Sequence, residues 1–150
     1  MDRKDRMVVL ASGAFDLVHY GHIRFLEEAR KAGGKNPYLV VVVARDRTVE
    51  RLKGRKPIIP EDQRRAVVES LKPVDEAILG FEDFSFEDTI RKIRPNIIAV
   101  GYDQKRIEEE ACKTIARIGV NVRVVCVGRF GPSDLDSSSK IKRKILDEGK

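Results

Sequence analysis

The amino-acid sequence predicts an α/β domain in which a five-stranded parallel sheet lies between two layers of helices. Five short apolar runs recur along the chain, and amphipathic helical patterns separate them. The run Leu39–Val43 is rich in β-branched residues and does not alternate with polar residues, which is typical of a strand covered on both faces. Strands and helices that alternate with linkers of this length form right-handed βαβ units, and such units build a three-layer domain.

Each element is predicted by its own local pattern. The first helix places Ile23 and Leu26 at helical spacing, and Gly33 and Gly34 end it. The second begins at Pro60, whose fixed φ suits a first helical position. The strands are expected at Met7–Ala11, Tyr38–Ala44, Val74–Leu79, Asn96–Val100 and Val122–Val127. The helices are expected at Tyr20–Lys31, Pro60–Leu71, Phe86–Ile93, Arg106–Ile118 and Ser138–Leu146.

The chain is the size of one ordinary domain. It has 150 residues, of which 41% are hydrophobic, and a chain of that length buries roughly two-thirds of its unfolded surface. No internal repeat, low-complexity tract or linker divides it. We therefore expect a single Rossmann-like domain over residues 1–150.

The charge of the chain favours an anionic ligand without identifying it. The net charge of +6 could suit nucleic acid, an acidic membrane surface or a phosphorylated metabolite. Lys and Arg are interleaved with Asp and Glu along the helical stretches, and six Phe and three Tyr are the only aromatic residues. This distribution argues against a nucleic-acid platform, and most of the charge is interpreted as solvated surface.

Cysteine usage and hydropathy predict a cytoplasmic protein. Cys112 and Cys126 lie outside any CxxC or Cys/His spacing, so reduced thiols are expected. The N-terminus is strongly charged, and no apolar stretch reaches the roughly 18 residues that a membrane span needs. Neither a signal peptide nor a membrane partner is predicted.

Ligands of open parallel sheets bind outside the carboxyl ends of the strands, where the strand order reverses. The residues that follow the five predicted strands are glycine or polar at most positions. They are Ser12–Asp16, Arg45–Asp46, Gly80, Gly101–Gln104 and Gly128–Phe130. This edge of the sheet is where a binding site is expected.

The strongest functional signal is the segment Gly13–His22, between the first strand and the first helix. Gly13 allows a sharp turn and a close approach to phosphate, and backbone amides at a helix start can bind an anion. His19 and His22, the two histidines of the chain, lie three positions apart, so their rings can share one side of the first turn. Such a pair can hydrogen-bond phosphate oxygens and stabilise charge that develops at phosphorus.

The histidine pair has two other interpretations. One histidine could cap the helix while the other packs on its surface, a reading that suits either residue alone better than the pair. A metal site is the third interpretation, but no cysteine or clustered acid accompanies the pair in sequence. No metal-ligating residue is therefore predicted.

The pattern GxFDxxHxGH resembles the signature of the HxGH nucleotidyltransferase superfamily. Further similarity runs through Val42–Asp46, Arg55–Pro60, Gln63–Arg64, Val74–Gly80 and Gly101–Gln104. Over nearly the whole chain the pattern is most similar to the archaeal FAD synthases, which are FMN adenylyltransferases. Glycerol-3-phosphate cytidylyltransferase is the nearest competitor. Ala14 departs from the pattern, because many relatives have Thr there, so only a backbone role is expected at this position.

The resemblance implies a role for each matching residue. His19 and His22 would hold the triphosphate through the transition state. Lys56 is a candidate catalytic cation, because a basic loop could close on the triphosphate, although the run of Lys53, Arg55 and Lys56 could instead be only a solvated loop. Arg64 is a further candidate cation, although it could equally be a surface residue of its helix. The implied nucleotide-binding residues are Ala14, Phe15, His19, Tyr20, Gly21, His22, Asp103, Phe130, Ser138 and Ser139. The two serines could instead simply cap the last helix, which their propensity alone would justify.

The resemblance implies transfer of AMP from ATP to FMN with release of pyrophosphate, aided by a divalent cation, Mg²⁺, in a cytoplasmic homodimer. The alternative acceptor is glycerol 3-phosphate or a similar polyol phosphate, with CTP as the nucleotide. A nucleotide sensor without turnover is a second alternative, and binding of nucleic acid is a third. The third is prompted by the basic charge and by HxGH-like motifs in class I aminoacyl-tRNA synthetases, but the chain is too short for such an enzyme.

Overall fold

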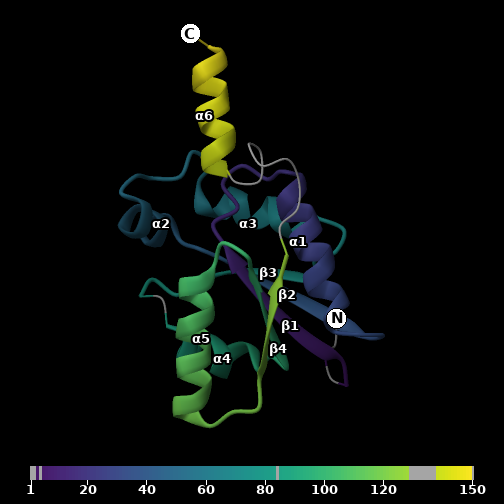
Figure 1. The fold of residues 1–150 in the computed structure, drawn as a ribbon. Coiled ribbons are helices and arrows are strands. Elements are labelled where there is room, and N and C mark those ends of the chain that lie inside the picture. Colours follow the sequence, from purple (N-terminus) through teal and green to yellow (C-terminus); the bar gives the residue numbers. More distant parts are fainter. Residues whose placement is uncertain (1–2, 4, 84, 129–137, 150) are drawn as a thin grey trace.

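The computed structural model describes residues 3, 5–83, 85–128 and 138–149, and it shows an α/β fold (Figure 1). The elements follow one another as β1 (Met7–Gly13), α1 (Tyr20–Lys31), β2 (Pro37–Val43), α2 (Asp46–Lys53), α3 (Glu61–Glu69), β3 (Glu76–Leu79), α4 (Phe86–Ile93), β4 (Ile97–Gly101), α5 (Lys105–Ile118), β5 (Arg123–Val127) and α6 (Ser138–Glu148).

The strands form one five-stranded sheet in which every neighbouring pair is parallel. The strand order is β3-β2-β1-β4-β5. The chain builds outward from β1 to β3, then crosses back to β4 on the other side of β1. The order therefore reverses between β1 and β4, which is the point where an open parallel sheet binds its ligand.

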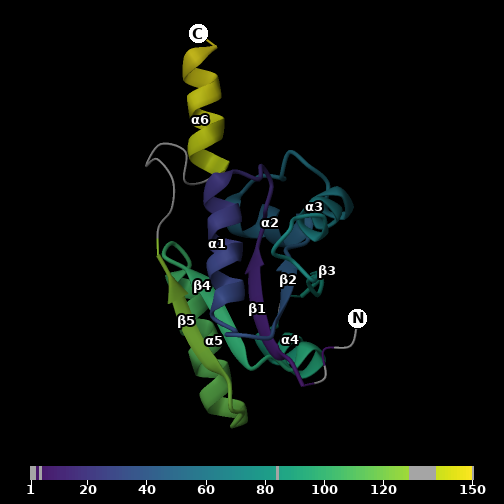
Figure 2. The ribbon, with the colours of Figure 1, turned by 90° about the vertical axis from the view of Figure 1, so that its right-hand side faces the viewer.

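The two faces of the sheet are covered by different helices. Successive side chains of a strand point to opposite faces. On β1, Val9 packs in the cluster that includes Leu26 of α1, whereas Val8 packs in the cluster that includes Ile90 of α4. Figures 1 and 2 show α1 on one side of the sheet, with α4 and α5 on the other. The expected three-layer architecture is confirmed.

The predicted strands and helices are all present, with ends that differ by a few residues. Helix α2 is not among the helices predicted from the sequence. Its sequence, DRTVERLK, has only Val49 and Leu52 as large apolar residues, so it lacks the long apolar stripe of a core helix. Gly54 ends it in the left-handed conformation, with φ 76°.

The last helix, α6, extends away from the body of the molecule (Figures 1 and 2). At its start it is tied to the segment after β1, because the Nζ of Lys142 donates to Oδ2 of Asp16 at 2.5 Å. Within the part of the chain that the structure describes, none of the helices combines the length and apolar character needed to span a lipid bilayer.

Candidate active site

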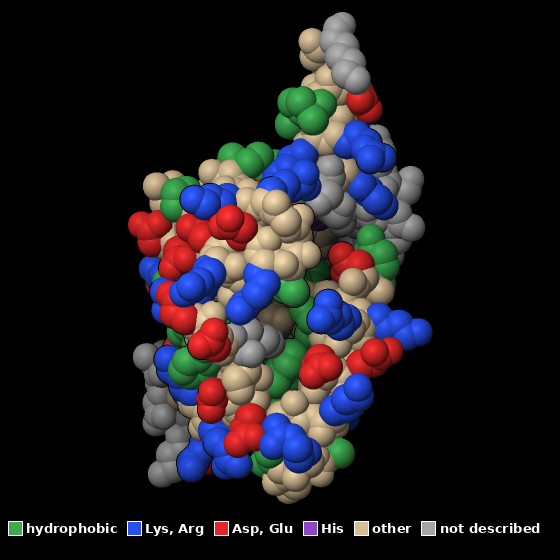
Figure 3. Space-filling view, turned by 90° about the vertical axis from the view of Figure 1, so that its left-hand side faces the viewer, with side chains coloured by type: hydrophobic (Ala, Val, Ile, Leu, Met, Phe, Trp, Pro, Cys, Tyr) green, Lys and Arg blue, Asp and Glu red, His purple; other side chains and the backbone are tan. Residues whose placement is uncertain are grey.

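A cavity of about 750 Å³ opens at the carboxyl edge of the sheet, where the strand order reverses. Gly13, Gly101 and Gly128, at or next to the ends of β1, β4 and β5, all line it. Figure 3 shows this side of the molecule, hollowed between charged side chains, with hydrophobic side chains inside the hollow. The cavity therefore lies at the edge of the sheet where the sequence predicts a binding site.

The turn after β1 is held in a strained conformation. Phe15 has φ 54°, in the left-handed region that costs a non-glycine residue about 1–3 kcal/mol. Its ring is buried, with 3% of the residue exposed, and it lies so close to Gly13 that a Cβ there would meet Phe15 Cε2 at 2.9 Å. Glycine at 13 is thus required by packing, and the turn must be held in place by its surroundings.

Arg64 of α3 supplies much of that support. Its guanidinium is completely buried and donates to the carbonyl oxygens of Ala14 at 2.6 Å, Ala44 at 2.8 Å and Ile59 at 2.8 Å. It also pairs with Oδ1 of Asp46 at 2.6 Å. One side chain thereby joins the turn after β1, the end of β2, the start of α2 and the loop before α3. Arg64 is a framework residue, and the alternative of a surface residue on its helix is wrong.

Asp16 anchors the other side of the turn. It is 3% exposed and accepts hydrogen bonds from the backbone N–H groups of Ile58 at 2.9 Å and Ile59 at 2.8 Å, and from Lys142. Burial alone would raise the pKa of Asp16, but the hydrogen bonds from Lys142 and the two amides outweigh it and lower that pKa. The carboxylate is therefore charged at neutral pH. The sequence reading assigned Asp16 no role of its own, although it lies within the motif.

The two histidines cap α1 with each other's help. His19 is the N-cap residue, and its Nδ1 accepts the backbone N–H of Gly21 at 3.1 Å. Nδ1 of His22 accepts the backbone N–H of His19 at 3.2 Å, which completes a capping box. The ring centroids are 3.9 Å apart, and both residues line the cavity. The geometric expectation that the rings share one side of the first turn is met.

This capping arrangement fixes which ring nitrogen can carry a proton. A neutral imidazole has one donor and one acceptor nitrogen, and here Nδ1 of each ring is the acceptor. Each Nε2 must therefore carry the hydrogen and act as a donor. Both residues line the cavity, their ring planes are 32° apart, and Nε2 of His19 is buried in this structure. A pair of N–H donors at a cavity wall is suited to adjacent oxygens of a polyphosphate.

The surroundings of His22 keep its ring neutral. Burial, followed by the nearby His19 and Lys53, lowers the pKa of His22 to about 3. The positive end of the α1 dipole acts in the same direction, because a cation is disfavoured at a helix N-terminus. At neutral pH the His22 ring is thus a hydrogen-bond donor through Nε2, not a positive charge.

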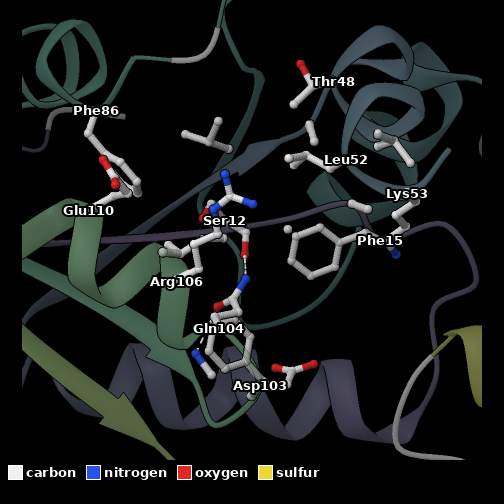
Figure 4. Close-up of a pocket in the computed structure, with 18 of the residues that line it drawn as sticks. Ser12, Phe15, Thr48, Leu52, Lys53, Phe86, Asp103, Gln104, Arg106 and Glu110 are labelled. Atoms are coloured by element: carbon white, nitrogen blue, oxygen red, sulfur yellow. Dashed lines mark hydrogen bonds between the residues drawn. The ribbon is translucent and has the colours of Figure 1, made fainter.

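Gln104 joins the two strands that flank the reversal point. Its Oε1 accepts the N–H of Gly101 at 2.8 Å, and its Nε2 donates to the carbonyl oxygen of Ser12 at 2.9 Å (Figure 4). The neighbouring Asp103 lines the cavity, and its predicted contact with the nucleotide stays a prediction. Gln104 ends the motif Gly101–Gln104, but its bridging role could not be predicted from the sequence.

Positive charge gathers beside the histidines. Lys53, at the end of α2, lines the cavity. Partial desolvation, then Lys142 and Arg55, lower its pKa, although Asp16 and Asp103 oppose them. Repulsion among cations at one place is relieved by a bound polyanion. Lys56, the predicted catalytic cation, is exposed and is not among the described residues that line the cavity, so its role stays a prediction.

Only some of the other residues predicted to bind the nucleotide are among the described residues that line the cavity. Ala14, Phe15 and Gly21 line the cavity, whereas Tyr20 is 60% exposed and is not among the described lining residues. Phe130 lies outside the described residues. Ser138 and Ser139 begin α6, but their side chains are outside the description. In the described ranges, no three His, Cys, Asp or Glu side chains are grouped so as to hold a metal ion.

The fold and the paired imidazoles at the reversal point define the class of protein as a nucleotidyltransferase. Residues 10–144 match the model of the cytidylyltransferase-like family, and the chain belongs to this family. The resemblance drawn from the sequence is confirmed.

Among curated relatives, the similarity is to FAD synthases. The FAD synthase of Aciduliprofundum boonei is 52% identical over 139 residues, which cover 93% of this chain and 90% of the relative. That of Methanopyrus kandleri is 49% identical over 93% of this chain and 91% of the relative.

Among solved structures, the lipopolysaccharide core biosynthesis protein of Thermoplasma volcanium matches with a TM-score of 0.76 at 42% identity. The match covers 84% of this chain and 99% of that chain. A protein of unknown function from Archaeoglobus fulgidus, at 17% identity and a TM-score of 0.62, shares the fold.

Proposed function

We propose that the protein is an FMN adenylyltransferase, which transfers AMP from ATP to FMN and releases pyrophosphate to form FAD. The observation that carries this proposal is identity near 50% to FAD synthases over about nine-tenths of both chains. The cavity agrees with it, because two imidazole donors and nearby cations suit a triphosphate. CTP-dependent transfer to a polyol phosphate is not favoured by these relatives.

The reaction is a direct displacement. An oxygen of the FMN phosphate attacks the α-phosphorus of ATP, a P–O bond forms, and the bond between the α-phosphorus and the bridging oxygen breaks. The electron pair leaves with pyrophosphate. The attacking phosphate is already an anion near neutral pH, so no general base is needed. The protein contributes position and charge stabilisation, as in other phosphoryl transfers.

The roles of individual residues follow from their positions. Nε2–H of His19 and of His22 would donate to triphosphate oxygens, and the amides of the turn at Ala14 and Phe15 would add backbone donors. Lys53 would lend charge from α2, with Lys56 as the cation predicted from the sequence. Asp103 contacts the nucleotide in this proposal. Contacts from Tyr20, Gly21, Phe130, Ser138 and Ser139 rest on the resemblance.

A divalent cation, Mg²⁺, completes the proposal. Mg²⁺ commonly binds through one or two carboxylates and the phosphates of its substrate while it keeps several waters. Asp103 gives the cavity wall a carboxylate of this kind, so the residues present fit such an ion. Bound to the triphosphate, the ion would supply neutralisation of its negative charge.

The test is detection of FAD by mass spectrometry after incubation with ATP, FMN and Mg²⁺. Riboflavin in place of FMN should give no product, because it lacks the attacking phosphate. CTP with glycerol 3-phosphate should give little pyrophosphate. Product from the CTP pair and none from ATP with FMN would contradict the proposal.

The proposal also includes the homodimer and the cytoplasmic location expected from the resemblance. Sedimentation equilibrium tests the first, since a homodimer would have twice the 17.0 kDa of the chain. A species at the mass of the monomer across the concentration range would contradict it.

A further inference from the structure

The cavity extends beyond the histidines into a slot between α2 on one side and α4 and α5 on the other. Thr48 and Leu52 of α2 line one wall, and Phe86 of α4 and Glu110 of α5 line the other. Figure 4 shows the two pairs on opposite sides of the cavity. Val42 of β2 also contributes to the lining. The slot is therefore built by elements from both halves of the sheet.

The slot has apolar walls that a ligand could cover. Leu52 is 64% exposed although it lines a cavity, so its side chain meets water in this structure. Phe86 is 8% exposed, and its packing in the core beneath the slot fixes its position. Figure 4 shows the methyl group of Thr48 directed toward the cavity, with the hydroxyl oxygen turned away. A flat apolar group between the walls would remove Leu52 from water.

The arrangement of the cavity separates the two substrates. Asp103 and Gly128 line its other end, beside β4 and β5, and Asp103 is the residue proposed to contact the nucleotide. The turn after β1 lies between this end and the slot, because Phe15 and Lys53 line the cavity next to Leu52 (Figure 4). A phosphorylated acceptor could place its phosphate at the turn and extend the rest of its length into the slot.

We propose that this slot binds the isoalloxazine ring of FMN, with the ring between Leu52 and Phe86. The ring is flat, with two apolar faces, and its polar edge would lie toward Glu110 at the rim. The inference rests on the proposed function and deepens it, because it assigns the residues that select a flavin over a smaller phosphorylated acceptor. A polyol phosphate has no apolar face to place between these walls.

The experiment measures KM for FMN and KM for ATP separately in Leu52→Ala and Phe86→Ala. Loss of an apolar contact in a binding pocket lowers the preference for the substrate that makes the contact by about tenfold or more. KM for FMN should therefore rise about tenfold, while KM for ATP stays within about twofold. Leu52 is exposed, so its variant should fold normally even if Phe86→Ala does not.

Matched controls come from apolar residues outside the described lining. Leu146→Ala, on the exposed surface of α6, controls for Leu52→Ala, and Phe81→Ala controls for Phe86→Ala. Neither should change either KM. Riboflavin, which has the ring without the phosphate, should compete with FMN in the wild type and compete less well in Leu52→Ala.

Two results would overturn the assignment. A rise in KM for ATP with KM for FMN unchanged would give the slot to the nucleotide. Unchanged values for both substrates would show that the slot binds neither. Failure of the proposed function can be told apart from failure of the slot assignment. If the proposed function is wrong, the wild-type protein itself would form no FAD from FMN and ATP.

Discussion

Replacement of His19 by asparagine should separate its capping role from its chemical role. The side-chain oxygen of asparagine is bonded to Cγ, as Nδ1 of histidine is, so it can still accept the N–H of Gly21, now 3.1 Å from Nδ1. Asparagine is also among the best N-cap residues. The variant keeps the cap of α1 but has no counterpart of Nε2. His19→Ala loses both functions.

The two variants should therefore lose activity equally and stability unequally. Removal of one donor to a developing charge costs about 3 kcal/mol, which is a fall of about a hundredfold in kcat. Loss of the cap in His19→Ala costs about 1 kcal/mol more, or roughly 2–4 °C in Tm for a domain of this size. His19→Asn should unfold within about 1 °C of the wild type.

The assay is pyrophosphate release at saturating ATP and FMN, combined with thermal unfolding of the three proteins. If folded His19→Asn keeps turnover within a few-fold of the wild type, Nε2 does not act on the reacting phosphates. If both variants lose activity only in proportion to their unfolded fraction, the histidine acts through the fold alone.

Three further predictions concern the support of the site. The pKa of about 3 for His22 means that its ring signals should not titrate between pH 5 and 8 in NMR spectra of the free protein. Folding lowers this pKa from its ordinary value of 6.5, so His22 should reduce stability as pH falls below 6.5; a titration near pH 6.5 would contradict both statements. Arg64→Met should destabilise the protein by about 3–5 kcal/mol in urea unfolding, because the carbonyl oxygens of Ala14, Ala44 and Ile59 lose their donor. Arg64→Lys should rescue this loss only in part, and a loss below about 1 kcal/mol would refute the framework role. Asp16→Asn should weaken the attachment of α6 through Lys142 and speed proteolysis near the C-terminus, and unchanged proteolysis would argue against the attachment. In the wild type the pKa of Asp16 is lowered, so the stabilisation that this carboxylate gives should be lost as pH falls through the lowered pKa.

The fold could be predicted because its signals are local. The apolar runs and the helical periods are properties of short windows, and each strand found in the structure overlaps a run such as Leu39–Val43. Helix α2 could not be predicted from its own sequence, because its stability depends on contacts with the rest of the chain. Asp46 at its start is held by Arg64, which is 18 residues away. No pattern within the eight residues of α2 could indicate that contact.

The candidate site contains residues that local sequence could place and residues that it could not. The histidine pair and the turn at Gly13 lie within one continuous segment, so spacing alone placed them on one side of the first turn of α1. Lys53 and Gln104 depend on which strands become neighbours. Gln104 reaches a carbonyl oxygen 92 residues away in sequence, on β1. Periodicity carries no information about such a contact, whereas the order of strands in the sheet determines it.

A crystal structure of the complex with ATP and Mg²⁺ would measure the distances from the two Nε2 atoms to the phosphate oxygens. Both should lie within hydrogen-bond distance, about 2.7–3.2 Å, while each Nδ1 keeps its backbone N–H partner. Rings turned so that Nε2 faces the protein, with the triphosphate bound elsewhere, would show that His19 and His22 only cap the helix.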